Sequence, residues 1–372
     1  MPFRFLHTAD WQVGKPFGNV PGDAGSDLRS QRIRTVQAVA EIAQAHTVDA
    51  VLVAGDAFDS NDVSDKTIVL TVEALRAFPG TWVFLPGNHD AALAHSVWTR
   101  LRAMGPPRNV VIADTPEIVD LWGGRAVVLP APLTRRREAF DQTEWFDAAA
   151  TPEGACRIGL AHGSVAGRLP GSAEATNEVA ENRAERAGLS YLALGDWHGA
   201  LKIAPRTYYS GTPETDRHRD NASGSIHLVE TNGLAVTESV LTIETGHYRW
   251  LLLEVPLVDG SCAAVLRELE GISEPRKAVV SLRVSGSITL AERRRLEAAL
   301  EGWESRVHHL DVDLAALHDE PTPDDLDAID TTGFVRRAVD RLKARADDPA
   351  DPGREAARVA LRLMYLDHLK SA

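Results

Sequence analysis

Short apolar runs alternate with amphipathic stretches over the first ninety residues of the chain. The apolar runs at 3–6, 50–54 and 81–85 have the length of buried strands. Between them, the stretches 32–45 and 63–78 carry apolar residues at helical spacing. This alternation predicts a layered α/β domain whose first three strands run parallel, so that their carboxyl ends share one edge of the sheet.

From about residue 110, short apolar runs joined by turns replace the helical stretches. They lie at 109–113, 126–129, 157–161, 191–194, 225–230 and 234–241. Stacking a second sheet on the first is the simplest way to bury these runs. We therefore expect residues 1–245 to form one α/β domain of two stacked mixed β-sheets flanked by helices.

The remaining third of the chain has a different pattern. Residues 246–318 predict a smaller α+β domain, with strands at 250–255 and 278–284 and helices at 263–270 and 290–303. Residues 319–330 hold six acidic residues, two prolines and no basic residue, which is typical of a solvated linker. Residues 331–372 predict a helical tail of two helices, and their nine Lys and Arg against six Asp and Glu give a local charge of +3.

Composition narrows the class of protein. Forty Lys and Arg against 53 Asp and Glu give a net charge of −13, which argues against a protein whose whole surface binds nucleic acid. The two cysteines, Cys156 and Cys262, form neither a disulfide framework nor a zinc-ligand cluster. No apolar run has the length of a signal-peptide core or a membrane span. We expect a cytoplasmic protein with no membrane partner.

Five loops offer metal ligands, and each follows a predicted strand. The candidate residues are Asp10 with Gln12, Asp56 with Asp59, Asn88 with His89 and Asp90, His162, and Asp196 with His198. Any one loop alone is equally typical of a strand end with a polar cap, but five in order are not. Carboxylate, amide oxygen and imidazole together suit Mn²⁺, Fe²⁺, Mg²⁺ or Zn²⁺. Two such ions bridged by one carboxylate form a clamp for in-line phosphoryl displacement.

These loops also share the order of a known family's motifs. They read Asp10, Gly55-Asp56 with Asp59, Gly87-Asn88-His89-Asp90, Ala161-His162, and Gly195 with His198. This set resembles the calcineurin-like metallophosphoesterase superfamily. More narrowly, the opening 5–11, the turn 209–213 and the unit after residue 246 resemble the SbcD-type nuclease subunit of bacterial SbcCD. The similarity covers residues 1 to about 318 and implies an αββα sandwich with a DNA-binding capping domain.

The resemblance implies a role for each candidate residue. One divalent ion would be held by Asp10, Gln12, Asp56 and His198, and a second by Asp56, Asn88, His162 and Asp196, with Mn²⁺ the first choice. His89 would protonate the leaving group or stabilise the phosphate oxygens, and Asp90 would orient its imidazole. Gln12 and Asp196 depart from the family, which usually has histidine at both positions, although both can still supply a ligand oxygen.

Two further segments carry predictions about partners. Arg135, Arg136 and Arg137 follow a predicted strand, where a phosphate contact and a solvated loop are about equally supported. The stretch 357–369 is apolar over more than one helical stripe, so it either packs back on the body or docks elsewhere. In the SbcD family such a tail binds the coiled-coil base of an SMC-like ATPase. The resemblance is also compatible with a homodimer.

The leading hypothesis is a Mn²⁺-dependent DNA nuclease, a 3′-to-5′ exonuclease with endonuclease activity that acts in DNA repair or end processing. The alternatives are a phosphodiesterase for a small nucleotide and a catalytically weak scaffold in a repair or defence complex. The charge of −13 is an average over unlike parts, because the linker carries six acidic residues and the tail is net positive. We therefore expect the isolated chain to hold DNA weakly and with strong salt sensitivity.

Overall fold

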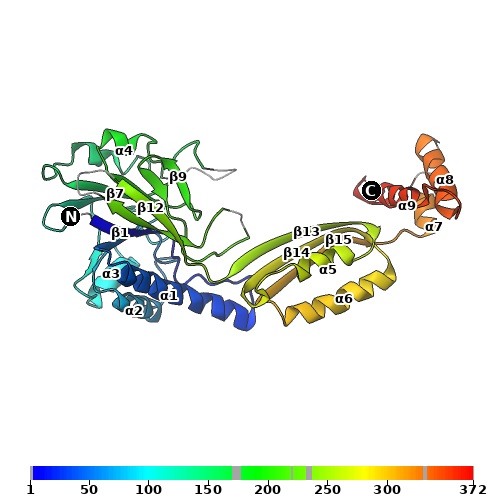
Figure 1. Cartoon of the computed structure of the whole chain (residues 1–372), viewed down its shortest axis with the longest axis horizontal. Coiled ribbons are helices and arrows are strands. Elements are labelled where there is room, and N and C mark those ends of the chain that lie inside the picture. The colour runs from blue at the N-terminus through cyan, green and yellow to red at the C-terminus, as the bar shows by residue number, and fades with distance from the viewer. Residues whose placement is uncertain (1–2, 170–176, 219–220, 232–236, 330–332, 372) are drawn as a thin grey trace. The chain divides into compact units, whose positions relative to one another are not determined.

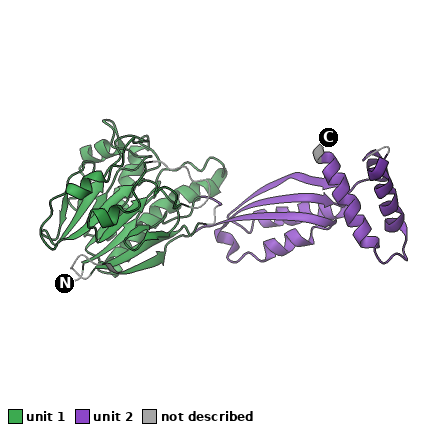
Figure 2. Cartoon of the chain, turned by 90° about the horizontal axis from the view of Figure 1, so that it is seen from above, with its two compact units in different colours: residues 1–216, 220–247 green, residues 217–219, 248–372 purple. Residues whose placement is uncertain are grey.

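The computed structural model describes residues 3–169, 177–218, 221–231, 237–329 and 333–371 and divides the chain into two compact units (Figure 2). The first unit comprises Met1–Asp216 and Asp220–His247, and the second comprises Arg217–Arg219 and Tyr248–Ala372. Part of the predicted strand 234–241 and the boundary between linker and tail lie outside the described residues.

The first unit contains two six-stranded sheets (Figure 1). In the first sheet, β1 to β4 run parallel and β11 and β12 add antiparallel strands beside β1. Its strands are β1 (Phe3–Thr8), β2 (Ala50–Val53), β3 (Thr81–Phe84), β4 (Val110–Ile112), β11 (Ser225–Thr231) and β12 (Thr237–Glu244). The predicted parallel order of the first three strands is confirmed.

The second sheet has the order β5-β6-β7-β8-β10-β9 and is also mixed. Its strands are β5 (Val119–Leu121), β6 (Ala126–Ala131), β7 (Cys156–His162), β8 (Tyr191–Gly195), β9 (Leu201–Ala204) and β10 (Thr207–Tyr209). Phe5 and Leu52 of the first sheet share a buried apolar layer with Ile158 and Tyr191 of the second. The predicted stacking of two mixed sheets is therefore confirmed.

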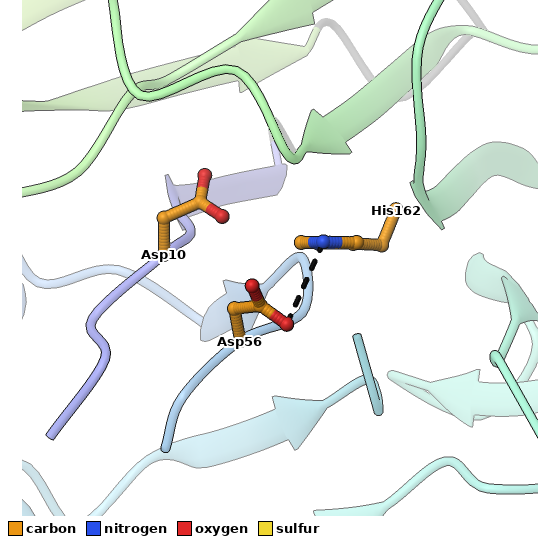
Figure 3. Close-up of side chains that lie close together, drawn as sticks. All are labelled: Asp10, Asp56 and His162. Carbon is orange, nitrogen blue, oxygen red and sulfur yellow. Dashed lines mark ion pairs between the residues drawn. The ribbon is translucent and has the colours of Figure 1, made fainter. Parts of the chain in front are cut away.

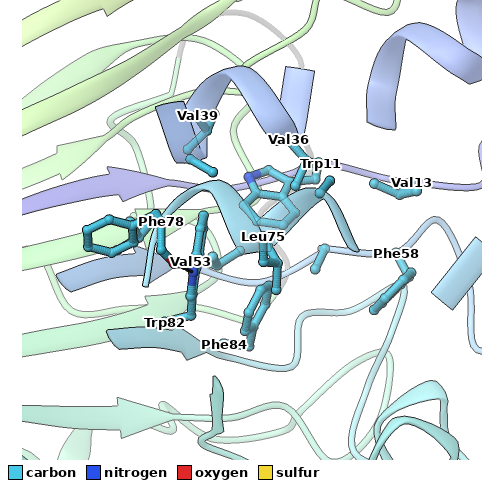
Figure 4. Close-up of a cluster of buried hydrophobic side chains, with 14 of the residues drawn as sticks. Trp11, Val13, Val36, Val39, Val53, Phe58, Leu75, Phe78, Trp82 and Phe84 are labelled. Atoms are coloured by element: carbon cyan, nitrogen blue, oxygen red, sulfur yellow. Dashed lines mark hydrogen bonds between the residues drawn. The ribbon is translucent and has the colours of Figure 1, made fainter. Parts of the chain in front are cut away.

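Helices cover the outer faces of both sheets. On the first sheet lie α1 (Gly22–Ala45) and α2 (Asp65–Ala74), with α3 (Val97–Ala103) nearby. Trp11, Trp82, Phe84 and Trp98 form the aromatic centre of this layer. Figure 4 shows Trp11, Trp82 and Phe84 within this cluster. The second sheet is covered by the short α4 (Arg183–Arg186) and a 3₁₀ turn at Glu144–Ala148. Each strand of the centre is thus buried on both faces, which explains its continuous apolar sequence.

The second unit is built on a parallel three-stranded sheet, β13 (Arg249–Gly260), β14 (Ala278–Ile288) and β15 (His309–Asp319). Helices α5 (Ala263–Glu270) and α6 (Leu290–Glu304) connect its strands and pack on one face through Leu269, Leu296 and Trp303. Strand β15 was not predicted, because alternating leucine and aspartate give it no continuous apolar run. The predicted helices at 263–270 and 290–303 are confirmed.

The end of the chain is helical. Helix α7 (Pro323–Ala328) forms inside the predicted linker, where Thr322 and Asp325 make a reciprocal capping box. The predicted tail contains α8 (Gly333–Asp347) and α9 (Arg354–Ser371), which share a small apolar core with α7. Helix α9 also contacts β13 and β14 of its own unit, while Phe334 is 79% and Leu363 52% exposed. Among the described residues, no helix is long and apolar enough to span a bilayer.

The aromatic centre generates the first prediction. Phe84→Ala should lower the free energy of unfolding of the first unit by about 3–5 kcal/mol, because Phe84 is buried against three tryptophans and its removal leaves a cavity. Urea titration followed by tryptophan fluorescence measures the loss. The matched control Phe140→Ala removes a side chain that is 79% exposed, and it should change stability by no more than about 0.5 kcal/mol. Equal losses in both variants would contradict the assignment of this core.

Candidate metal centre

The candidate site lies where strands of both sheets of the first unit end. Asp10 and Asp56 follow β1 and β2, and His162 is the last residue of β7. One ligand atom from each of these three side chains lies within 4.8 Å of the others (Figure 3). Loops that are far apart in sequence therefore deliver two carboxylates and an imidazole to one buried point.

The imidazole of His162 is held in one orientation. Its Nδ1 lies 2.9 Å from the backbone oxygen of Ala54, so Nδ1 carries the proton and donates it to that carbonyl. The other nitrogen, Nε2, then faces the carboxylates, 3.6 Å from Asp56 Oδ1 and 3.8 Å from Asp196 Oδ1. With Nδ1 held in this way, Nε2 is the nitrogen left to bind a metal ion.

Asn88 and Asp196 complete this side of the cluster. Asn88 Nδ2 lies 3.4 Å from Asp196 Oδ1, and Ser164 donates its hydroxyl to Asp196 Oδ2 at 2.7 Å. Within the part of the chain that the structure describes, Asn88 Oδ1 and His162 Nε2 are buried atoms without a hydrogen-bond partner. A buried polar atom without a partner is costly, so two such atoms aimed into one acidic cluster fit a bound cation.

The other side of the cluster contains Asp10 and His198. The backbone nitrogen of Asp196 lies 3.2 Å from both carboxylate oxygens of Asp10, and His198 Nε2 lies 4.0 Å from Asp10 Oδ1. Gln12 lies beside His198, with its Nε2 3.3 Å from the imidazole Nε2. The structure thus brings all seven predicted ligands to one region, although Gln12 turns its amide nitrogen rather than its oxygen toward His198.

The sequence reasoning missed one residue of the site, Asp216. Its carboxylate lies 3.5 Å from His198 Nδ1 and 3.0 Å from the guanidinium of Arg32, and its side chain is almost fully buried. These groups, together with Lys15, outweigh burial and hold the pKa of Asp216 well below its usual range. A carboxylate behind a ligand histidine fixes the ring. The only signal was its place three residues after the predicted turn 209–213.

The prediction that Asp90 orients His89 is wrong. Both oxygens of Asp90 accept backbone hydrogen bonds, from Gly87 at 2.7 Å and Phe58 at 3.0 Å, so this buried carboxylate ties the loops after β2 and β3 together. The His89 ring instead has Nδ1 2.8 Å from the backbone oxygen of Asp59. His89 also donates its backbone N–H to Asp56 Oδ1 at 2.9 Å, which places it directly beside the cluster.

Four of the seven candidate ligands have a left-handed backbone conformation. Asp10, Gln12, Asp56 and Asp196 all have positive φ, at 53°, 43°, 52° and 98°. Residues other than glycine rarely adopt this left-handed backbone region, and such strain persists where function requires it. Position 87 requires glycine, because a Cβ there would lie 2.2 Å from Asp56 Oδ1.

The electrostatics of the cluster favour a cation. Burial raises the pKa of Asp10 to about 6, against the opposing pull of His198 and His162. Burial alone would lower the pKa of His162, but the charges of Asp56, Asp10 and Asp196 outweigh it and raise that pKa to about 9. Among the described residues, Asp10, Asp56 and Asp196 form ion pairs only with histidines. The donor set therefore fits a divalent ion.

The predicted arginines lie outside this cluster. Arg135, Arg136 and Arg137 are in the exposed loop that follows β6, where Arg135 pairs with Glu138 at 3.1 Å.

His7, which is buried in β1, contacts the hydroxyl of Tyr191 and the backbone oxygen of Leu194, as a structural histidine does.

The comparisons with known proteins identify the family of the first unit. The family model described as calcineurin-like phosphoesterase matches residues 3–200, which include every candidate ligand. The chain belongs to this family. The resemblance predicted from the loop motifs is thereby confirmed, and the assignment makes the chain a hydrolase of phosphate esters.

Proteins named as SbcD or Mre11 are similar to this chain at modest sequence identity. The SbcD component of the nuclease SbcCD from Escherichia coli K12 is 30% identical over 141 residues, which cover 36% of this chain and 34% of that protein. The SbcD subunit of Bacillus subtilis is 24% identical over 81% of this chain and 84% of its own length. DNA double-strand break repair protein Mre11 of Aeropyrum pernix is 27% identical over 69% and 64%. A purple acid phosphatase structure from yellow lupin matches 66% of this chain at 13% identity, with a TM-score of 0.41.

The cluster generates a prediction about metal binding. Mn²⁺ should raise the melting temperature of the protein by several degrees, since an ion at about 100 times its Kd stabilises the folded state by about 2.7 kcal/mol. Asp56→Asn should abolish this shift, because Asp56 lies between both halves of the cluster. Differential scanning fluorimetry with and without Mn²⁺ measures it. Asp62→Asn, which neutralises an exposed carboxylate in the same loop, should retain the full shift; its loss there would show that the ion binds elsewhere.

Proposed function

We propose that this protein is a DNA nuclease that hydrolyses phosphodiester bonds with two divalent ions, of which Mn²⁺ is the best, and that it works as a 3′-to-5′ exonuclease with endonuclease activity in DNA repair or end processing. The observation that carries the proposal is the buried cluster of Asp10, Asp56 and His162, with Asn88 Oδ1 beside it, which has no hydrogen-bond partner among the described residues. The names of the relatives supply the substrate class.

The ligand sets follow from the two sides of the cluster. Asp56, Asn88, His162 and Asp196 would hold one ion, and Asp10, Asp56 and His198 with Gln12 the other. When bound, such ions lower the pKa of a water molecule and offset the negative charge that develops on the phosphate. The backbone N–H of His89 donates to Asp56 and holds its carboxylate in position for both ions. Mg²⁺, Fe²⁺ and Zn²⁺ are compatible with the same donors.

His89 is the proposed catalytic residue. Its Nδ1–H donates to the backbone oxygen of Asp59, which leaves Nε2 on the other side of a ring that is only partly buried. When the imidazole is protonated, Nε2–H can donate to a phosphate oxygen or to the leaving alkoxide. The Asp59 carbonyl, and not Asp90, holds the ring in this orientation.

DNA contacts would come from the exposed loop after β6. Arg135, Arg136 and Arg137 are all exposed there, and guanidinium groups bind phosphate in a bidentate manner. The second unit, with its parallel sheet, is the proposed DNA-binding cap. The arginine contacts with phosphate would be electrostatic, so binding of DNA should weaken steeply as salt concentration rises.

Digestion of defined substrates tests the proposed activity. End-labelled duplex DNA, single-stranded DNA and a generic phosphodiester dye ester are each incubated with the protein and Mn²⁺. Hydrolysis of DNA, with products shortened from the 3′ end, supports the nuclease. Hydrolysis of the dye ester alone would instead favour a small-nucleotide phosphodiesterase, and no hydrolysis with Mn²⁺ bound would favour a scaffold.

A variant pair tests the role of His89. His89→Ala should lower the rate of DNA hydrolysis by about 10²-fold or more, the order expected for loss of a general acid, while the protein still binds Mn²⁺. His95→Ala removes an exposed histidine a few residues away and should keep the full rate. Full turnover in His89→Ala, with both metals retained, would exclude the role.

We also propose that α8 and α9 form the docking segment for an SMC-like coiled-coil ATPase of the SbcC type. Helix α9 presents Leu363 and α8 presents Phe334 to solvent, although both helices also contribute to a small core. Exposed apolar side chains on a helical pair are typical of a helix-docking surface.

Removal of residues 331–372 should abolish co-purification with the co-expressed ATPase while leaving nuclease activity on short substrates unchanged. Because deletion also removes part of the small core, the point variants Phe334→Asp and Leu363→Asp provide a second test and should weaken co-purification at least tenfold. Leu290→Asp, at a 61% exposed position on α6, is the matched control and should co-purify normally. Normal co-purification of all variants would place the partner's site elsewhere.

A further inference from the structure

Four side chains form a closed ring on one side of the metal cluster. Lys15 Nζ lies 3.4 Å from Gln12 Oε1, and Gln12 Nε2 lies 3.3 Å from His198 Nε2. On the other side of the imidazole, His198 Nδ1 lies 3.5 Å from Asp216, which in turn accepts from Lys15 at 2.5 Å. Gln12, His198 and Asp216 are all buried, whereas the side chain of Lys15 is 22% exposed.

The donors and acceptors of this ring leave one consistent assignment. An ammonium group only donates, so the atom of Gln12 that faces Lys15 is the amide oxygen. The amide nitrogen therefore points at His198, whose Nε2 must accept, and Nδ1 carries the proton that faces Asp216. In this arrangement Gln12 Oε1 and His198 Nε2, the two atoms that would ligate an ion on this side, are both engaged in hydrogen bonds.

The opposite side of the cluster is different. Asn88 Oδ1 and His162 Nε2 are buried and, within the described residues, have no hydrogen-bond partner. His162 is already locked with Nε2 toward the carboxylates by its bond to Ala54. An ion there gains these two ligands and replaces only the contacts of His162 Nε2 with Asp56 and Asp196, at 3.6 and 3.8 Å. An ion beside Asp10 and His198 must instead turn the Gln12 amide away from Lys15 and break hydrogen bonds.

We propose that Lys15 is a positioning residue that makes the two metal positions unequal. The inference rests on the proposed two-metal function and deepens it. The position at Asn88 and His162 fills first and tightly. The position at Asp10 and His198 binds its ion more weakly, because Lys15 holds the Gln12 oxygen and its positive charge repels a divalent ion. Asp216 keeps its charge compensated by Arg32 when Lys15 turns away, so the ring can open without leaving a buried carboxylate unpaired.

Calorimetric titration of the full chain with Mn²⁺ alone tests this inference. The unaltered protein should bind one ion tightly and a second with clearly lower affinity. Lys15→Met keeps the length of the side chain but removes its charge, and it should tighten the weaker step by about tenfold or more while the tight step stays the same. Gln12→Glu, which keeps the shape and adds a ligand charge, should also tighten the weaker step. Lys277→Met removes an exposed lysine of the second unit and should change neither step.

Two equal binding steps in the unaltered protein would overturn the inference, as would Lys15→Met and Gln12→Glu titrations that match it. Either result, together with normal hydrolysis of DNA, leaves the proposed function intact. Absence of Mn²⁺ binding in every variant would overturn both. Electron paramagnetic resonance of unbound Mn²⁺ counts the ions independently, so a change in the heat of binding alone cannot imitate the expected result.

Discussion

The structure depends on burying acidic side chains that carry no lysine or arginine partner. Asp10 and Asp56 are almost fully buried, yet among the described residues their ion pairs are with histidines alone. A buried carboxylate without compensation is strongly unfavourable. A divalent cation supplies that compensation, and the positive φ angles of Asp10 and Asp56 show how much local strain the fold tolerates to bring them together.

Two other carboxylates of the same unit, the buried Asp216 and the partly buried Asp141, show the contrast. Asp216 is paired with Arg32 and Lys15, and Asp141 with the buried Arg183. These acids are satisfied by the protein itself and act as supports, Asp216 for His198 and Asp141 for the loop near Ala180. Asp216 and Asp141 thus differ from Asp10 and Asp56, which have no lysine or arginine partner among the described residues and lie where strands of both sheets end.

Most of the first unit could be predicted because its central strands are buried on both faces. Such strands leave a continuous apolar run, as at β2 and β3, and the parallel order follows from the helices between them. The first turns of α1 were missed, since its polar residues 22–31 bury only Gly25, Leu28 and Gln31 and show no clear apolar period. β15 was missed for a related reason: one face is open, so acids alternate with leucines. α7 formed in a segment whose acidic composition suggested a linker, because Thr322 and Asp325 cap a helix there.

The sequence by itself determined which side chains are candidate ligands and in what order they occur, because a ligand must be a particular residue type at the end of a strand, and both properties can be read locally. The tertiary structure alone decided how those ligands are held. His89 is oriented by a backbone oxygen of Asp59, which has no side-chain signature, and not by the neighbouring carboxylate of Asp90. His198 is held between Gln12 and Asp216, and Lys15 reaches a partner 201 residues away. Contacts over such separations depend on how two sheets stack, and no local pattern records that.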